Sequence, residues 1–286
     1  MVKQSQLDKI DFQDGIVVTH ERKKIRHFNG LFLINLLASI FMLLPIFMII
    51  WVSFTPDATY TVPLTKWSLR WYQEISKYPR FFDGFKISLL LGVSAATISI
   101  ILGFLASFAL NRYDFRGKSV LDTLFLSPLT IPHVALGFAF LIFSFSVGLY
   151  NTFWNFLLAH IVCTTPYSVR TIGTSLAGVG KDMELAAMNL GASWFKSFTK
   201  VTIPLIKTGM IGAFLFAFLI SFGEVTIAIF IAGSRWMPLP LVMFNFMADR
   251  NTPMIAAVST MLIVFAGGLA LLIDRIVGLK TLMTSG

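Results

Sequence analysis

The longest uncharged stretch of the chain runs from Thr123 to Val169 and reads TLFLSPLTIPHVALGFAFLIFSFSVGLYNTFWNFLLAHIVCTTPYSV. Its 47 residues include no Asp, Glu, Lys or Arg. A helix crosses a bilayer with about 20 mostly apolar residues, so the stretch is too long for one crossing. The expected break is Ser146–Asn151, because Gly148 interrupts the apolar run there. The stretch therefore predicts two consecutive transmembrane helices.

Other nearly uncharged stretches each predict one more helix of spanning length. The predicted spans are residues 28–54, 87–110, 123–145, 153–174, 208–232 and 253–274. The predicted fold class is all-α, a polytopic membrane protein with six transmembrane helices. The predicted organisation is an N-terminal tail (1–27), a six-helix transmembrane domain (28–276) that includes a long loop (178–207), and a C-terminal tail (277–286).

The composition agrees with this class and excludes others. Of the 286 residues, 56% are hydrophobic and 13% are charged, whereas an ordinary soluble domain has about a quarter charged residues. The mean hydropathy of +0.78 excludes a soluble enzyme and a disordered scaffold. A porin-like barrel is excluded because its strands alternate polar and apolar residues. One Cys and four dispersed His argue against a disulfide framework or a metal site.

The distribution of basic residues predicts the orientation. An even number of spans places both termini on one side of the membrane. Of the 23 Lys and Arg residues, 16 lie on that side and seven on the other. Because cytoplasmic loops carry the excess of basic residues, both termini are predicted to be cytoplasmic. The net charge of +9 is explained by this topology, so no nucleic-acid partner is expected.

The most informative loop lies between the fourth and fifth predicted spans. Its central part, from Lys181 to Pro204, reads KDMELAAMNLGASWFKSFTKVTIP. It is too polar to span a membrane, and the small residues Ala186, Ala187 and Gly191 permit close approach of a partner. Pro204 fits the first turn of the next helix. Two interpretations stay open: a linker on the membrane surface, or a docking helix for a cytosolic protein.

This loop resembles the cytoplasmic EAA loop of permease subunits of binding-protein-dependent ABC importers. That pattern is Glu-Ala-Ala, three residues, Gly, nine residues, then Ile-x-Leu-Pro. The matching residues are Ala186, Ala187, Gly191, Val201, Ile203 and Pro204. Leu185 stands at the position of the pattern's Glu, and Glu184 precedes it by one residue.

Other segments extend the resemblance over roughly residues 30–275. They are Trp67–Tyr72, Asn111–Lys118, Ser221–Thr226, Leu239–Pro240 and Thr252–Ser259. These segments are similar to the polyamine, opine and phosphonate class, and most similar to the second permease subunit of spermidine/putrescine importers. Such subunits commonly have Ser-Phe-Asp followed by another acid, and here Gly223 replaces the first acid.

The resemblance implies a type I ABC importer permease fold, a bacterial inner membrane location and several partners. These are a homologous second permease subunit, a cytosolic ATPase dimer, a periplasmic solute-binding protein and membrane lipid. The sequence contains no Gly-x-x-x-x-Gly-Lys-Ser/Thr phosphate loop,. No cofactor and no catalysis are therefore expected in this chain, and ATP and Mg would bind to the partner ATPase.

A short helix near Ala187–Ser197 is expected to sit in a groove of that ATPase. The fourth and fifth spans flank the loop and are expected to carry its movement into the membrane. The residues expected at the ATPase contact are Glu184, Ala186, Ala187, Gly191, Ala192, Trp194, Phe195 and Pro204.

Glu224 is the single acid well inside a predicted span. Ionisable residues there are costly and usually face a cavity or a partner. Ser221, Glu224 and Ala228 have the spacing of one helical face. This face is predicted to line the substrate pathway and to offer a carboxylate to an amine. The alternative is a structural hydrogen bond, or an ion pair with the partner subunit.

His133 and His160 lie in the third and fourth predicted spans, where hydrogen-bonded packing is favoured over a proton relay. The sequence predicts a permease subunit that passes a small solute, a polyamine or related amine, from a periplasmic binding protein to the cytoplasm by alternating access. The alternatives are an ion-coupled secondary transporter and a membrane scaffold that docks a cytosolic protein. The absence of an evident inverted repeat argues against the secondary transporter.

Overall fold

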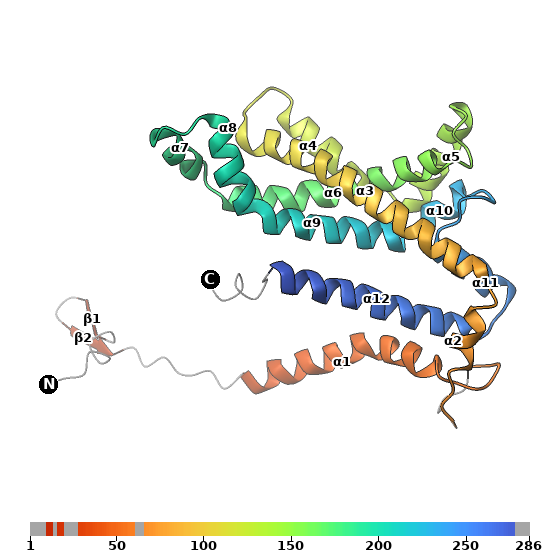
Figure 1. Ribbon diagram of the computed structural model, residues 1–286. Helices are drawn as coiled ribbons and strands as arrows, with labels where there is room; N and C mark the ends of the chain where they lie inside the picture. Colours follow the sequence, from red (N-terminus) through yellow and green to blue (C-terminus); the bar gives the residue numbers. More distant parts are fainter. Residues whose placement is uncertain (1–9, 14–15, 20–27, 61–65, 278–286) are drawn as a thin grey trace. The chain divides into compact units, whose positions relative to one another are not determined.

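Helices form nearly all of the structure in the computed structural model, which describes residues 10–13, 16–19, 28–60 and 66–277 (Figure 1). The helices are α1 (Phe28–Val52), α2 (Arg70–Ile75), α3 (Pro79–Arg112), α4 (Lys118–Leu126), the 3₁₀ turn η2 (Ser127–Leu129), α5 (His133–Ser146), α6 (Phe153–Gly178), α7 (Lys181–Asn189), α8 (Trp194–Ser197), the π-helical turn η3 (Phe198–Thr202), α9 (Ile203–Gly223), α10 (Thr226–Ile231), α11 (Leu239–Asp249) and α12 (Met254–Val277).

The N-terminal tail adds one hairpin that the sequence analysis did not predict. Strands β1 (Ile10–Gln13) and β2 (Ile16–Thr19) pair antiparallel, with Ile10 opposite Thr19. The remaining elements in the described part of the chain are helical, as expected.

By its internal contacts the chain divides into two units, Met1–Met48 and Ile49–Gly286. The first unit contains the hairpin and most of α1. Every residue of α1 from Gly30 to Ile49 is exposed, and its sequence is apolar on all sides, which is typical of a helix surrounded by lipid.

Four described helices are long and apolar enough to cross a membrane, and they fall on the predicted spans 1, 2, 5 and 6. They are Gly30–Val52, Pro79–Arg112, Trp194–Gly223 and Met254–Ile273. The bent pair of helices Lys118–Leu129 and His133–Ser146 counts as a fifth candidate span if the two are taken as one. The predicted fourth span falls on α6, which has 26 residues but carries many polar side chains buried against its neighbours. The described residues therefore give four or five spans by length and apolarity, against the six expected.

Two predicted spans are not continuous helices. The third is bent by 100° between η2 and α5, because Pro132 lacks an N–H group and disfavours helical backbone at the residue before it. The fifth begins as a helix at Trp194 and ends at Gly223. Glu224 then adopts an extended backbone before α10 begins.

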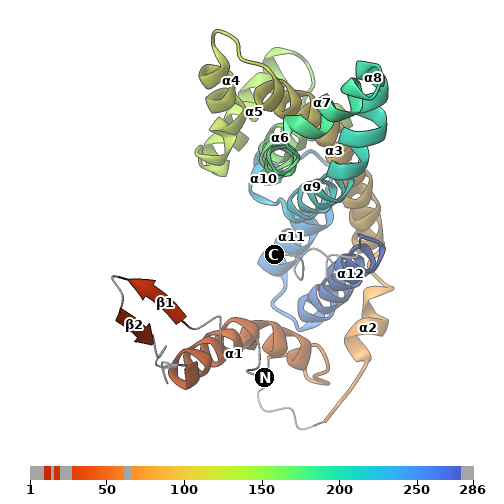
Figure 2. The ribbon, with the colours of Figure 1, turned by 90° about the vertical axis from the view of Figure 1, so that its left-hand side faces the viewer.

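The core of the second unit is formed by α3, α6 and α9, which lie side by side in both views (Figures 1 and 2). Small residues on α3 permit this close packing. A Cβ atom on Gly92 would lie 2.9 Å from the ring of Phe218 in α9. One on Gly103 would lie 2.6 Å from Cβ of Ser168 in α6.

The two ends of this core differ. Helices α7 and α8 lie at one end of α6 and α9, while α10 and α11 lie at the other end (Figure 1). At that second end, Trp71 of α2 and Phe81 of α3 share a buried apolar cluster with residues of α11 and α12. The core therefore separates the α7–α8 loop from the helix break that contains Glu224.

Candidate functional site

The backbone of the loop between α6 and α9 is fixed by a cap at the end of α7. Gly191 has a φ of +91°, a conformation that favours glycine. Its N–H donates to the carbonyl of Met188 at 2.9 Å, and the N–H of Ala192 donates to Ala187 at 3.1 Å. This pair of bonds is the Schellman motif that ends helices. The glycine of the EAA pattern therefore has a conformational role in this chain.

The expected single helix near Ala187–Ser197 is wrong, because this cap ends α7 at Asn189. A second helical run begins at Trp194 and passes through η3 into α9. Within that run Pro204 is the second residue of α9, so its predicted place in the first turn of this helix is confirmed. Because proline cannot donate the usual hydrogen bond of an α-helix and crowds the preceding turn, it accounts for the π-helical turn just before it.

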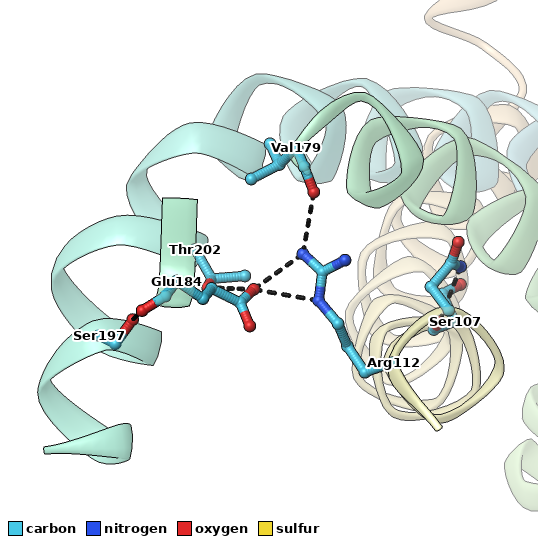
Figure 3. Close-up of polar contacts among 7 residues, drawn as sticks. Ser107, Arg112, Val179, Glu184, Ser197 and Thr202 are labelled. Atoms are coloured by element: carbon cyan, nitrogen blue, oxygen red, sulfur yellow. Dashed lines mark hydrogen bonds and ion pairs between the residues drawn. The ribbon is translucent and has the colours of Figure 1, made fainter. Parts of the chain in front are cut away.

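Glu184 is the polar centre of the loop (Figure 3). Its Oε1 accepts hydrogen bonds from Nε of Arg112 at 3.0 Å and from Oγ1 of Thr202 at 2.8 Å. Nη2 of Arg112 lies 2.8 Å from the same oxygen and donates to the carbonyl of Val179 at 3.1 Å. The hydroxyl of Ser197 donates to the backbone carbonyl of Glu184 at 3.2 Å. The Arg112–Glu184 pair thus joins the ends of α3 and α6 to the start of the α8–α9 run.

This ion pair is largely removed from solvent. The side chain of Arg112 is 8% exposed and that of Glu184 is 14% exposed. Removing one partner of a buried pair costs about 3–5 kcal/mol, because the other charge stays buried without compensation. The sequence predicts Glu184 at the ATPase contact but does not indicate Arg112 as its partner.

A weaker electrostatic contact joins the α3–α4 turn to the start of α7. Oδ1 of Asp114 accepts a hydrogen bond from Nζ of Lys118 at 2.9 Å. That bond, with the charges of Lys118 and Lys181, holds the pKa of Asp114 below its ordinary value. Because these groups are exposed, solvent screens the interaction.

Aromatic contacts reinforce the junction. The ring of Trp194 stacks on Phe198 with a centroid distance of 5.4 Å. Phe198 also contacts Phe108 and Phe104 of α3, at 5.4 and 5.9 Å. The α8–η3 segment is therefore attached to α3 by apolar packing, in addition to the ion pair of α7.

The tip of the loop carries an exposed apolar surface. This tip surface consists of Leu185 (50% exposed), Leu190 (90%), Trp194 (51%) and Phe195 (66%). Leu190 was not among the predicted contact residues. It directly precedes the glycine of the α7 cap, and this position explains why its side chain projects into solvent. Of the other predicted contact residues, Ala186, Gly191 and Pro204 are exposed, while Ala187 and Ala192 are partly buried.

The second candidate site surrounds Glu224, which is 8% exposed. Its Oε1 accepts a hydrogen bond from the N–H of Ile227 at 2.9 Å and so satisfies a donor in the first turn of α10,. Its Oε2 lies 2.8 Å from Nδ1 of His133, the first residue of α5. The carboxylate therefore joins the breaks of two bent membrane segments.

The expected common face of Ser221, Glu224 and Ala228 is wrong in its geometry, because the helix ends at Gly223. Ser221 is 3% exposed and its hydroxyl lies 2.7 Å from Nδ1 of His160 in α6. Ala228 is fully buried. Ser221 therefore contacts His160, whereas Glu224 contacts His133. Both histidines are hydrogen bonded. A role of these residues in the substrate pathway stays a prediction.

Comparisons with known proteins agree with this arrangement. The family described as "Binding-protein-dependent transport system inner membrane component" matches residues 98–279, which include both candidate sites. The spermidine/putrescine transport system permease protein PotC of Haemophilus influenzae is 30% identical, over 81% of this chain and 90% of that protein. The putrescine transport system permease protein PotI of Escherichia coli is 31% identical, over 80% of this chain and 84% of that protein.

A more distant relative is similar in sequence, and a solved structure is similar in fold. The putative 2-aminoethylphosphonate transport system permease protein PhnV of Salmonella paratyphi A is 29% identical, over 68% of this chain and 74% of that protein. A chain of a bacterial ABC transporter involved in alginate import has the same fold, with a TM-score of 0.65, 15% identity, and coverage of 87% of this chain and 97% of that chain. The chain therefore belongs to the family of inner membrane components of binding-protein-dependent transport systems and is a multi-pass permease subunit of an ABC importer.

Proposed function

We propose that this chain is one of two homologous permease subunits in a bacterial inner membrane importer for polyamines or related amines. A periplasmic binding protein delivers the solute, and a cytosolic ATPase dimer that binds ATP and Mg supplies the energy. The chain alternates access between the two sides of the membrane. Its loop 178–207 contacts the ATPase.

The tip surface is the observation that carries this proposal. Four exposed apolar side chains project at the loop that matches the EAA pattern, and exposed apolar patches commonly mark protein interfaces. The fixed cap at Gly191 holds Leu190 outward. A tip surface with a fixed backbone is better suited to bind in a groove of a protein partner than to lie on the membrane surface.

The arrangement of the second unit supports a cytoplasmic C-terminus. The C-terminal part of α12 lies toward the same end of the unit as α7 and α8 (Figure 1). The loop with the tip surface is also one of the basic segments assigned to the cytoplasm,. We therefore place this end of the unit on the cytoplasmic side.

The substrate class rests on Glu224 and on the names of the relatives. A carboxylate at a helix break inside a membrane segment is costly and suits an amine or ammonium group. PotC and PotI are named for spermidine and putrescine transport.

The test is purification of the tagged chain from its own cell in mild detergent, followed by reconstitution and measurement of ATP-driven uptake of labelled putrescine and spermidine. We expect an ATPase, a second permease and a binding protein to co-purify. Leu190→Asp should reduce the co-purified ATPase at least tenfold. Leu69→Asp is the matched control, because Leu69 is 57% exposed and precedes α2, outside the candidate membrane spans. A chain that purifies alone and transports with an ion gradient would overturn the proposal.

A further inference from the structure

We propose that Arg112 is a positioning residue that makes α3 a third carrier of the loop's movement, in addition to α6 and α9. This inference rests on the proposed contact between the loop and the ATPase. The two helices that flank the loop are covalently continuous with it. Helix α3 is far from the loop in sequence and is joined to α7 through the Arg112–Glu184 pair.

The geometry gives this pair an unusual position. Arg112 is the last residue of α3, and Glu184 lies in the middle of α7. The guanidinium group bridges two acceptors, Oε1 of Glu184 at 2.8 Å and the carbonyl of Val179 at 3.1 Å. A planar guanidinium with several fixed donors constrains the direction of its partners, whereas a lysine would supply only a point charge. The pair thus fixes α7 against α3 and against the end of α6 at once (Figure 3).

The aromatic contacts do not replace this attachment. Trp194 and Phe198, which pack near Phe108 of α3, belong to α8 and η3. They follow the cap at Gly191, where the chain turns. Without the ion pair, α7 would be joined to α3 indirectly, through the hydrogen bonds of Glu184 with Ser197 and Thr202 of the α8–η3 segment.

Helix α3 is suited to carry the movement across the membrane. It has 34 residues, which corresponds to about 51 Å, more than the roughly 30 Å of a hydrocarbon core. At its other end the hydroxyl of Ser88 accepts a hydrogen bond from the N–H of Leu239 at 2.8 Å, in α11. A Cβ atom on Gly84 would lie 3.1 Å from Cα of Leu239. A displacement of α7 therefore has a direct route through α3 to α11, at the opposite end of the unit.

The first test compares complexes that carry Arg112→Ala, Arg112→Lys or Arg116→Ala, reconstituted at equal amounts of the co-purified ATPase. Arg116 is the matched control, since it is an exposed arginine in the turn after α3. We expect Arg112→Ala to keep ATP hydrolysis within twofold of the wild type and to lower uptake at least fivefold. Arg112→Lys should be intermediate, and Arg116→Ala should resemble the wild type. Arg112→Glu combined with Glu184→Arg should restore uptake at least threefold relative to either single variant.

The second test measures whether α7 and α3 move together. Spin labels at Met183→Cys and Leu105→Cys, both exposed positions, are introduced with the single native Cys163 replaced by Ala. We expect a narrow distance distribution that is the same with ADP and with ATP in the wild-type background. Arg112→Ala should broaden the distribution and make it depend on the nucleotide.

The outcomes separate this inference from the proposed function. An Arg112→Ala complex with unchanged uptake per ATP and an unchanged distance distribution would overturn the inference and leave the ATPase contact intact. Loss of assembly in both the Ala and Lys variants would also overturn it, because Arg112 would then be a structural staple. Failure of the proposed function is seen independently, as a wild-type chain that retains no ATPase.

Discussion

Nδ1 of His133 lies 2.8 Å from Oε2 of Glu224, and each of these residues stands at a break in a membrane segment. Broken helices leave backbone groups without partners, and inside a membrane these groups need protein or water. Glu224 meets part of this need by accepting the N–H of Ile227. The side chain of His133 is 37% exposed, whereas that of Glu224 is 8% exposed. An amine that approached Oε2 would therefore have to displace the imidazole.

The first prediction concerns the charge of Glu224. Glu224→Gln keeps the size of the side chain and an oxygen that can accept from Ile227, but it removes the negative charge. A hydrogen bond to a charged group contributes about 1.5–3 kcal/mol, which corresponds to roughly 10- to 100-fold in binding. We expect uptake of putrescine and spermidine to fall by roughly that factor at equal amounts of complex. Normal uptake of every amine tested would show that the carboxylate has no charge-selective role.

The second prediction concerns the imidazole of His133. His133→Gln preserves a side-chain donor, so we expect uptake within about twofold of the wild type. His133→Leu leaves the buried carboxylate without this donor, and an unsatisfied buried group costs about 1–3 kcal/mol. The leucine variant should give less folded complex, lower uptake, or both, as measured by size-exclusion yield and initial rates. Equal behaviour of the two variants would contradict a hydrogen-bonding role.

Much of the fold could be predicted because a membrane selects for apolar length, which a sequence displays directly. Thr123–Val169 indicated two helices, and they are separated at the expected place, with Gly148 at a φ of +71°. Pro128 and Pro132 predict a kink in the third span, but not the 100° break before His133, because a proline inside an apolar run is compatible with either a kink or a break. The end of α9 at Gly223 was also not predicted. The sequence is apolar on both sides of Gly223 and Glu224, so hydropathy alone does not indicate that a helix ends there.

The third prediction follows from the cap of α7. At a φ of +91°, a β-branched residue is strained, whereas Asn is tolerated better,. No atom lies within 4 Å of a Cβ built on Gly191, so the difference between substitutions reports backbone conformation and not crowding. We expect Gly191→Val to reduce co-purified ATPase and uptake several-fold, and Gly191→Asn to have a smaller effect. If Gly191→Val and Gly191→Asn lowered co-purified ATPase and uptake equally, the glycine would instead be needed for close approach of the ATPase.

The candidate site could be predicted only in part, because its most important contacts join distant segments. The EAA pattern located the loop, on which Phe195 is exposed. Arg112 and Glu184 are 72 residues apart, and no local pattern indicated that they would meet. Leu190 was overlooked because an isolated leucine in an amphipathic loop does not reveal the cap that turns it outward.

The last prediction concerns the packing of α3 against α6 in the core of the second unit. A Cβ on Gly103 would lie 2.6 Å from Cβ and 2.9 Å from the carbonyl carbon of Ser168, so Gly103→Leu must separate the two helices. Overpacking costs about 1–3 kcal/mol, and more where backbone must move. We expect Gly103→Leu to lower the midpoint of thermal unfolding in detergent and the yield of monodisperse complex, with Gly103→Ala intermediate. Gly267→Leu is the control, because Gly267 is an exposed glycine on α12 with no atom within 4 Å of a built Cβ. Equal stability of the Gly103→Leu and Gly267→Leu variants would mean that α3 and α6 do not pack this closely in the working complex.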